Sequence, residues 1–270
     1  MWLGYRRCLR TIACQGENVR TKGRFAYRID IGRVRVSNED QAVVLTNADG
    51  DVLLLVCDGM GGHNKGDFAS RTAISVLSEA FKDKTKFIHP FLAKRWLTRA
   101  IRFANKEIYD AAFANEAYKD MGTTLVAALI IEDHIIIANI GDSRAYAIRH
   151  EGLQRLTEDQ TYVDYLYRTG KITQEEIATH PKRHVLMNAL GIYPSLTLDV
   201  TASPYIGFSI LLCSDGLYNN ISEKEMHAIL STEERPEQKV ETLIKVANSN
   251  GGSDNIAIAY WEVIKNDQNR

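Results

Sequence analysis

Aspartates stand at the ends of several strongly apolar segments of this 270-residue chain. Asp58 follows the run LLLVC, Asp215 follows ILLCS, Asp254 precedes NIAIAYW, and Asp142 lies between two further apolar runs. A single aspartate at a strand end is usually a turn former, because its side chain bonds to the local backbone. Four of them beside strands apolar enough to be central need a compensating cation, because buried like charges repel one another. The pattern therefore predicts a cation site.

The donor types indicate which cation this is. A further acidic pair, Glu39-Asp40, precedes the segment that begins at Gln41, and no cluster of histidine or cysteine accompanies the carboxylates. Acidic oxygen ligands of this kind favour Mg²⁺ or Mn²⁺ over zinc. Gly59 has no Cβ, so its carbonyl oxygen can also reach an ion. Two ions about 3.5–4 Å apart would lower the pKa of a bridging water and supply hydroxide at neutral pH.

Arg35, in the segment GRVRVSNED, lies four residues before Glu39. A guanidinium can bind two phosphate oxygens at once, which an ammonium group does less well. Taken alone, Arg35 is a surface arginine. Beside a site with two metal ions, it becomes a candidate for holding a phosphoryl group.

The elements that must position these residues follow from periodicity and turn signals. The expected strands are 25–32, 41–58 with a hairpin turn at Asp49-Gly50, 123–131, 134–140, 143–150, 207–215 and 255–263. The expected helices are 67–81, 91–115, 222–230 and 236–248, with helical stretches and a helix start at Thr173 between 157 and 181. Successive strands joined by short turns favour antiparallel pairing, and helices packed on the sheet faces give a layered α+β domain.

Composition bounds the class of protein. The chain is 45% apolar, carries a net charge of −1, and its four cysteines show no CxxC spacing. This predicts one soluble domain in a reducing, cytoplasmic compartment. The charge balance gives no indication of binding to nucleic acid or to an anionic membrane. No run approaches the ~18 apolar residues of a membrane span, so no membrane insertion is expected. The first 22 residues are basic but lack a continuous apolar core, which argues against a secretory signal.

Six motifs occur in a fixed order along the chain: R-x-x-x-E-D, D-G-M-G-G, M-G-T-T, G-D-S-R, S-D-G and D-N. Together they resemble the metal-dependent Ser/Thr protein phosphatases of the 2C type, and D-G-M-G-G is typical of the bacterial branch. The resemblance runs from about Phe25 to Val263, so we expect a phosphatase domain over residues 25–265. Residues 1–24 form an N-terminal extension to which we assign no role.

The resemblance implies a fold and a site. The fold is a four-layer α-β-β-α sandwich of two central antiparallel sheets flanked by helices, with a flap at about residues 157–184 near the active site. Asp58, Asp215 and Asp254 would bind one Mn²⁺ or Mg²⁺ ion, and Asp58 with the Gly59 carbonyl would bind the second. Glu39 and Asp40 would act through bound waters, and Arg35 would hold the substrate phosphate. Asp142 would join Asp215 at a third, less certain ion.

Two positions depart from the family pattern. Met60 stands where eukaryotic relatives carry a histidine proposed as general acid. His63 could replace it or be an exposed loop histidine, and protonation by a metal-bound water is equally open. His184 follows the segment His180-Pro181-Lys182-Arg183, where bacterial relatives often carry Ser or Asn. If His184 reaches the third ion, imidazole could change the preference for the metal.

The implied reaction is hydrolysis of phosphoserine or phosphothreonine by attack of a hydroxide that bridges two ions, without a covalent intermediate. The partners would be phosphorylated proteins, substrates of a Ser/Thr kinase in the same cell. An aspartyl-phosphate phosphatase needs D-x-D after its strand, but the residue two after Asp58 is Met60. A cysteine phosphatase needs Arg six residues after its nucleophile, but that position is His63 after Cys57 and Asn219 after Cys213. P-loop and G-x-S-x-G signatures are absent. A phosphoprotein-binding domain without activity would have lost ligands that this chain retains. A phosphodiesterase or nuclease would need a surface for a polyanion, which the charge balance disfavours.

Overall fold

The structure is a computed structural model in which residues 23–62 and 65–264 are described. Most of the expected extension, residues 1–22, and the candidate general acid His63 lie outside the described residues. The first strand, β1 (Gly23–Asp30), begins two residues before the expected strand and ends two residues earlier. Gly32 then turns the chain with a φ of +80°, a conformation that favours glycine.

Ten strands form two five-stranded sheets. The first sheet has the order β1, β12 (Ile256–Val263), β11 (Ser209–Cys213), β8 (Arg144–Ile148) and β9 (Leu153–Arg155). The second has the order β10 (Asp199–Pro204), β7 (His134–Ile140), β6 (Leu125–Ile131), β3 (Val52–Cys57) and β2 (Gln41–Thr46). A short ribbon pairs β4 (Gly59–Met60) with β5 (Gly122–Thr123). Every pairing is antiparallel, as the short connections predict.

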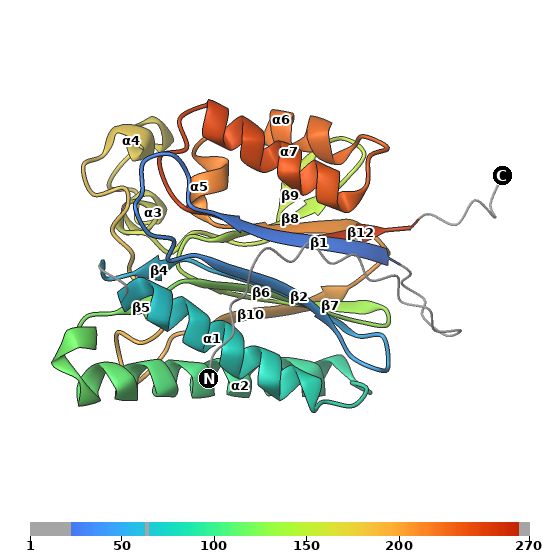
Figure 1. The fold of residues 1–270 in the computed structure, drawn as a ribbon, viewed down its shortest axis with the longest axis horizontal. Helices are drawn as coiled ribbons and strands as arrows, with labels where there is room; N and C mark the ends of the chain where they lie inside the picture. Colours follow the sequence, from blue (N-terminus) through green and yellow to red (C-terminus); the bar gives the residue numbers. More distant parts are fainter. Residues whose placement is uncertain (1–22, 63–64, 265–270) are drawn as a thin grey trace.

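Helices cover the outer face of each sheet (Figure 1). α1 (Lys65–Lys82) and α2 (Pro90–Ala114) pack on the second sheet, and α6 (Glu223–Leu230) and α7 (Pro236–Ser249) pack on the first. Shorter helical elements are η1 (Glu116–Tyr118), α3 (Tyr162–Arg168), α4 (Gln174–Thr179) and α5 (Asp215–Tyr218). The four layers and the antiparallel pairing confirm the α-β-β-α sandwich expected from the sequence.

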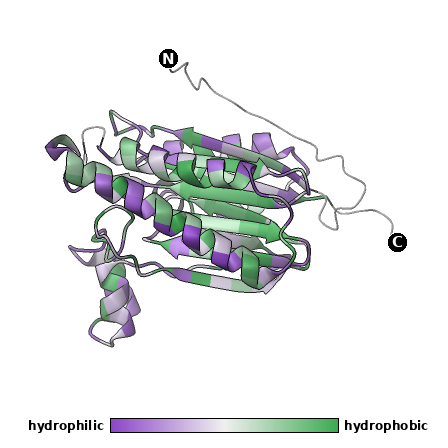
Figure 2. Cartoon of the chain, turned by 90° about the horizontal axis from the view of Figure 1, so that it is seen from below, coloured by the Kyte–Doolittle hydropathy of each residue, from purple (hydrophilic) through white to green (hydrophobic). Residues whose placement is uncertain are grey.

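Three apolar layers hold the four structural layers together. Along β3, Leu53, Leu55 and Cys57 face the helices while Leu54 and Val56 face the opposite sheet. Both faces of the central strands are therefore buried, which explains why their sequences are continuously apolar instead of alternating. Figure 2 shows these strands coloured hydrophobic between helices of mixed colour.

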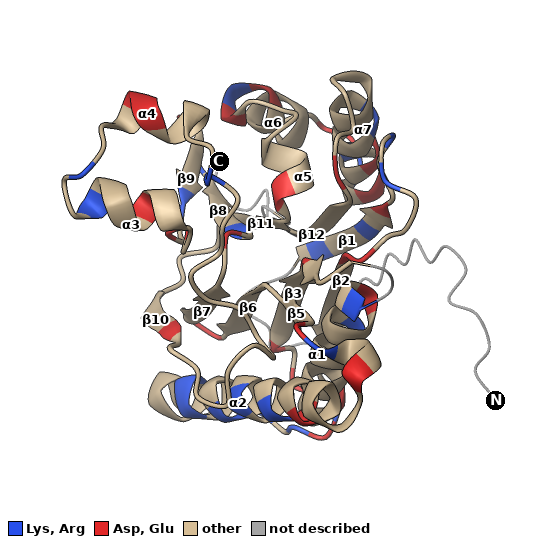
Figure 3. Cartoon of the chain, turned by 90° about the vertical axis from the view of Figure 1, so that its left-hand side faces the viewer, with Lys and Arg blue, Asp and Glu red and all other residues tan. Residues whose placement is uncertain are grey.

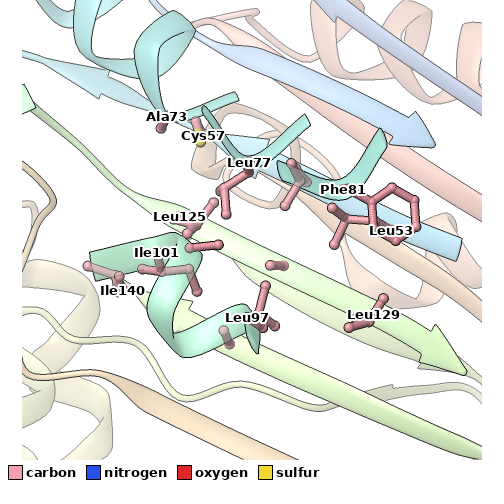
Figure 4. Packing of buried hydrophobic residues seen from close by; sticks show 14 of the residues in the cluster. Leu53, Cys57, Ala73, Leu77, Phe81, Leu97, Ile101, Leu125, Leu129 and Ile140 are labelled. Carbon is pink, nitrogen blue, oxygen red and sulfur yellow. The ribbon is translucent and has the colours of Figure 1, made fainter. Parts of the chain in front are cut away.

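The layer beneath α1 and α2 shows how the helices are fixed. Leu77 and Phe81 of α1 and Leu97 and Ile101 of α2 are fully buried against strand residues such as Leu125 (Figure 4). Burying each such side chain stabilises the fold by roughly 1.5–3 kcal/mol. The apolar stripe of α2 therefore fixes that helix along the second sheet.

Some elements differ from the expected ones. The segment 123–131 is interrupted at Thr124, and the segment 207–215 ends as a strand at Cys213, so Asp215 begins α5. β9 and β10 were not predicted. β10 is an edge strand whose residues are largely exposed, so it has no apolar run to reveal it.

The register of the strands brings distant loops to one end of the sandwich. Gln41 pairs with Cys57, Leu125 with Ile140, Arg144 with Cys213, and Asp30 with Ile256. In each of these pairs, the last residue of one strand lies beside the first residue of the neighbouring strand. The connecting loops after β1, β3, β7 and β11 therefore meet there, and Figure 3 views the molecule from this side.

The predicted flap projects from this end and contains α3 and α4 (Figure 3). Thr173 starts α4 with a reciprocal capping box to Glu176, which confirms the expected helix start. The base of the flap is closed by an isolated bridge between Thr161 and Leu186 and by the Met187 amide, which donates to the Gln160 carbonyl at 2.8 Å. The flap is therefore anchored at both of its ends.

Leu97→Ala tests the packing of α2. Because Leu97 is completely buried, its truncation should lower the free energy of unfolding by about 2–5 kcal/mol. Leu92→Ala on the same helix removes a side chain that is half exposed, so it should change that free energy by less than about 0.5 kcal/mol. Urea unfolding followed by circular dichroism measures both, and equal effects would contradict the assigned orientation of α2.

Candidate metal centre

Asp58 lies between β3 and β4 with its backbone held on both sides. Its amide donates to the Thr124 hydroxyl at 2.9 Å, and its carbonyl accepts from the Thr124 amide at 2.8 Å and the Thr123 hydroxyl at 2.9 Å. These bonds satisfy the polar groups of the main chain where β3 leaves the sheet. The carboxylate is thus fixed at the end of a buried strand.

Gly59 and Gly66 make room for Glu39. The Gly59 amide donates to the Glu39 carbonyl at 3.2 Å, and the Ser70 hydroxyl donates to the same oxygen at 2.6 Å. A Cβ at Gly59 would stand 2.2 Å from the Gly66 carbonyl oxygen, and one at Gly66 would stand 2.2 Å from Oε2 of Glu39. Only glycine fits these two positions, so the glycine-rich sequence is explained by close approach of the backbone.

Asp40 connects the two sheets. It is almost fully buried at the start of β2, and the Ser214 hydroxyl donates to its Oδ2 at 2.6 Å. The same hydroxyl oxygen accepts from the Ala257 amide at 2.8 Å. Ser214 thus links an acid of the second sheet to strands of the first.

Asp215 is the first residue of α5, directly after β11. Its Oδ2 accepts from the Asn219 side-chain amide at 3.1 Å. Its Oδ1 is buried and accepts no hydrogen bond from any described residue. A buried carboxylate oxygen without a donor is a costly arrangement, and a bound cation would relieve it.

Asp254 and Arg35 form an ion pair at the mouth of the site. The Arg35 guanidinium donates to Oδ2 of Asp254 at 2.7 Å, and the Asn255 amide donates to Oδ1 at 2.8 Å. The bond to Asp254 is the largest cause that raises the pKa of Arg35, and the charges of Asp58 and Asp215 raise it further. Arg35 is therefore within the electrostatic reach of the acidic cluster.

Asn255 holds the loop that carries Arg35. Its side-chain amide donates to the carbonyls of Ile31 and Ser37 at 2.9 Å each, and its Oδ1 accepts from the Glu39 amide at 2.9 Å. Both N–H groups and the oxygen of this side chain are used. The loop between β1 and β2 is thereby fixed to the start of β12.

Asp142 lies in the turn between β7 and β8 and is 9% exposed. Its carbonyl accepts from the Tyr218 hydroxyl at 3.1 Å. The Arg144 guanidinium lies 3.5 Å from the centre of the Tyr218 ring and forms an ion pair with Asp159. An arginine and a tyrosine therefore support the acidic cluster from the side of β8.

Burial and mutual repulsion weaken the acidity of this cluster. Burial is the largest of the causes that raise the pKa of Asp40 to about 8, of Asp142 to about 7 and of Asp215 to about 6. Charges of the neighbouring carboxylates add to each shift, and the pKa of Asp58 is raised well above its ordinary value for the same two reasons. The site therefore favours either protons or another positive charge.

The donor set fits a hard divalent ion. The acidic groups supply only oxygen ligands, Asp215 offers a buried oxygen with no donor, and a Cβ at Gly59 would be obstructed. Within residues 23–62 and 65–264, however, no three Asp, Glu, His or Cys side chains are already arranged to enclose an ion. Asp254 is paired with Arg35. The loops bring the candidate ligands to one end of the sandwich.

A cavity of about 450 Å³ separates the acidic cluster from the flap. Arg183 and His184 of the flap line it together with Asp215 and Asp254. His184 therefore lies beside the predicted metal centre. Its contact with a metal ion stays a prediction. His63 lies outside the described residues, so its role as general acid also stays a prediction.

The structure thus places the other candidates at one end of the sandwich: Arg35, Glu39, Asp40, Asp58, Gly59, Asp142, Asp215 and Asp254. Ser214, Thr124 and Asn255 stand within the motifs S-D-G, M-G-T-T and D-N, but sequence reasoning gave them no individual role, and it did not name Tyr218. For Ser214 and Asn255, the available signal was a hydroxyl or amide residue directly beside an aspartate. Such residues cap turns often enough that the signal alone does not identify them.

The fold and the site define an α-β-β-α protein with an acidic, oxygen-rich centre where its two sheets meet. A family model described as protein phosphatase 2C matches residues 33–257. The serine/threonine phosphatase stp of Listeria monocytogenes is 41% identical over 237 residues, covering 87% of this chain and 94% of that protein. The chain therefore belongs to the protein phosphatase 2C family, which confirms the predicted family and enzyme class.

Solved structures agree with this assignment. Stp1 from Staphylococcus aureus has a TM-score of 0.85 and 32% identity, covering 94% of this chain and all of that one. The catalytic domain of the phosphatase PstP, solved in complex with two manganese ions, has a TM-score of 0.78 and 32% identity, covering 90% of this chain and 99% of that one. The predicted fold is confirmed by both.

The raised pKa values predict how stability depends on pH in the presence of a chelator. In the unfolded chain these carboxyls titrate near pH 4, so between about pH 4 and 8 the native state binds more protons than the unfolded state. The free energy of unfolding should therefore fall by several kcal/mol as pH rises from 5 to 8.5. Urea unfolding in EDTA at a series of pH values measures this.

Asp58→Asn should make the metal-free protein more stable at pH 8 and flatten the curve, because it removes one of the repelling charges. Asp83→Asn, which changes an exposed carboxylate after α1, should leave the curve unchanged. A wild-type curve that is flat or rises with pH would contradict the repulsion.

Proposed function

We propose that this chain is a Mn²⁺- or Mg²⁺-dependent protein serine/threonine phosphatase whose active site is the acidic centre at the end of the sandwich. The observation that carries the proposal is the convergence of buried carboxylates from four separate loops beside an arginine. Such a cluster is expensive to bury without a cation. The manganese-bound PstP relative and the serine/threonine phosphatases in the family support the same reading.

The ligand roles are assigned from the family pattern and the chemistry of each group. Asp58, Asp215 and Asp254 would hold one ion, and Asp58 with the Gly59 carbonyl would hold the second. Glu39 and Asp40 would position water molecules next to them. A third ion near Asp142 and Asp215 is part of the proposal, with His184 as a further candidate ligand.

When bound, two such ions would supply Lewis acidity and an activated water as the nucleophile at neutral pH. The residues of this chain have the task of arranging the substrate for that attack. Arg35 would leave its pair with Asp254 and grip two oxygens of the phosphoryl group. Its position at the mouth, with the side chain more than half exposed, suits contact with an incoming phosphoprotein.

The leaving serine or threonine oxygen needs a proton. His63 is one candidate donor, and a water molecule at the centre is the other. Met60, which occupies the position of the eukaryotic histidine, has no proton to give. The cavity lined by Arg183 and His184 would receive the substrate chain around the phosphorylated residue.

The cellular setting follows by analogy. We propose phosphorylated proteins made by a Ser/Thr kinase of the same cell as substrates, in keeping with the serine/threonine phosphatases to which the chain is similar. A cytoplasmic location is supported by Cys57 and Cys213, which are buried free thiols on strands of the two sheets.

Removal of metal tests the central part of the proposal. The purified protein should hydrolyse a phosphothreonine peptide and p-nitrophenyl phosphate with Mn²⁺, lose this activity in EDTA, and regain it when Mn²⁺ is restored. Asp58→Asn and Asp254→Asn should each lower kcat more than about a hundred-fold, since even a partner that only supports a metal ligand is worth about 10–100-fold.

Circular dichroism shows whether these variants are folded, and Asp83→Asn serves as the control with an unaltered site. Hydrolysis that continues undiminished in EDTA would rule out the metal-dependent mechanism. A folded Asp58→Asn variant with full activity would rule out the assigned ligand.

Substitution of Arg35 tests phosphate binding. Arg35→Ala should lower kcat/KM about ten- to hundred-fold, because a charged hydrogen-bonding partner of the phosphate is lost, and Arg35→Lys should recover part of it. Arg33→Ala is the matched control, since Arg33 bonds to the Asn248 carbonyl at 3.2 Å instead of to the acidic cluster. Steady-state kinetics measures all three, and equal values for the Arg35 and Arg33 variants would assign Arg35 to the surface.

A further inference from the structure

The charges of this chain are unevenly distributed. From Lys84 to Lys106 the sequence contains no aspartate or glutamate, although the whole chain has a net charge of −1. The cations of this segment are Lys84, Lys86, Lys94, Arg95, Arg99, Arg102 and Lys106. They lie on the connection between α1 and α2 and along most of α2, where Figure 3 shows basic residues along the helix. We call the exposed surface of this segment the α2 basic face.

Few of these cations are neutralised. Among the described residues, Lys86 pairs with Glu132 and Lys106 with Asp110, and no other member of the face forms an ion pair. Arg95, Arg99 and Arg102 are all exposed and follow the four-three spacing that places side chains on one side of a helix. The outward side of α2 is therefore a stripe of positive charge.

Exposed apolar side chains lie at the beginning of this stripe. Ile88 is 87% exposed, Phe91 is 64% exposed and Leu92 is 51% exposed. We call these three residues the apolar tip. Phe103, 55% exposed, adds a ring further along the helix. Neighbouring exposed apolar residues with cations around them mark an interaction surface.

The apolar tip lies far from the metal centre. The Phe87 amide donates to Oδ2 of Asp51 at 3.2 Å, and Asp51 directly precedes β3. Asp58 follows the other end of the same strand, and six residues of extended chain span roughly 20 Å. A partner bound at the tip would therefore leave the active site open.

We propose that the α2 basic face and its apolar tip bind the surface of a bilayer that contains anionic phospholipid. The arginine stripe complements the negative headgroups, and the tip residues can enter the boundary between headgroups and acyl chains. Two of the three tip residues, Ile88 and Leu92, are aliphatic, so they gain from hydrocarbon, whereas only Phe91 offers a ring for base stacking; this favours lipid over nucleic acid.

This contact is peripheral. No helix within residues 23–62 and 65–264 is long and apolar enough to cross a bilayer. The net charge of −1 gave no sign of the surface, because acidic residues elsewhere in the chain cancel the local excess. Binding would hold the phosphatase beside phosphorylated proteins at the membrane with its catalytic end free.

Co-sedimentation of the full chain with lipid vesicles tests the proposal. The protein should bind vesicles of phosphatidylcholine and phosphatidylglycerol at roughly 3:1, bind vesicles of phosphatidylcholine alone far less, and be released at about 0.5 M salt. The triple variant Arg95→Gln, Arg99→Gln, Arg102→Gln should lower the partition coefficient about a hundred-fold, at about five-fold for each charge. Ile88→Ser with Phe91→Ser should also weaken binding while its salt dependence remains.

A matched control removes three exposed cations outside the α2 basic face: Lys171→Gln between α3 and α4, Lys224→Gln on α6 and Lys245→Gln on α7. This variant should bind as the wild type does, and all variants should retain hydrolysis of p-nitrophenyl phosphate. Wild-type protein that does not bind the anionic vesicles overturns the proposal, as does capture of an acidic peptide or RNA in place of vesicles. Undiminished binding by the arginine variant also overturns it, since the contact would then belong to other residues, such as Arg6, Arg7 and Arg10 of the N-terminus.

Discussion

Repulsion among buried carboxylates is the constraint on which this structure depends. Asp40, Asp58, Asp142 and Asp215 share one end of the sandwich, and both burial and their mutual charge raise their pKa values. Without a cation, such a cluster opposes folding at neutral pH. Its members are also the groups that a hard divalent ion prefers. The same repulsion that costs stability would therefore favour the binding of a metal ion, and it would link folding to that binding.

The rest of the fold keeps these acids together. Three apolar layers fix the two sheets and their helices, and antiparallel register brings the loops to one end. Ser214 then bonds to Asp40 across the sheets, Thr124 holds the backbone of Asp58, and Asn255 fixes the loop of Arg35. These bonds restrain the backbones, whereas the side chain of Asp254 is paired with Arg35. In the proposed reaction, Arg35 would change partner from Asp254 to the phosphoryl group of the substrate.

Sequence patterns predicted the central strands well, because a strand buried on both faces is apolar at every position, as in β3. They indicated the candidate acids because each carboxylate stands beside such a run, and the roles of these acids stay predictions. They missed β10 because an exposed edge strand has no apolar signature. They gave Ser214 and Asn255 no role, although both stand in quoted motifs, because hydrogen bonds between residues far apart in the chain have no sequence periodicity. The net charge also gave no indication of the basic stripe of α2, because a net charge does not show where in the chain the charged residues lie.

Titration of the protein with Mn²⁺, followed by the electron paramagnetic resonance of the free ion, tests the link between the acidic cluster and metal most directly. The account predicts that the wild-type protein binds two ions tightly at pH 7.5 and that affinity falls at pH 5.5, where protons occupy the same carboxylates. Asp58→Asn should lose tight binding of both ions while remaining folded. A wild-type protein that leaves all added Mn²⁺ free, or an Asp58→Asn variant that still binds two ions tightly, would contradict the central claim.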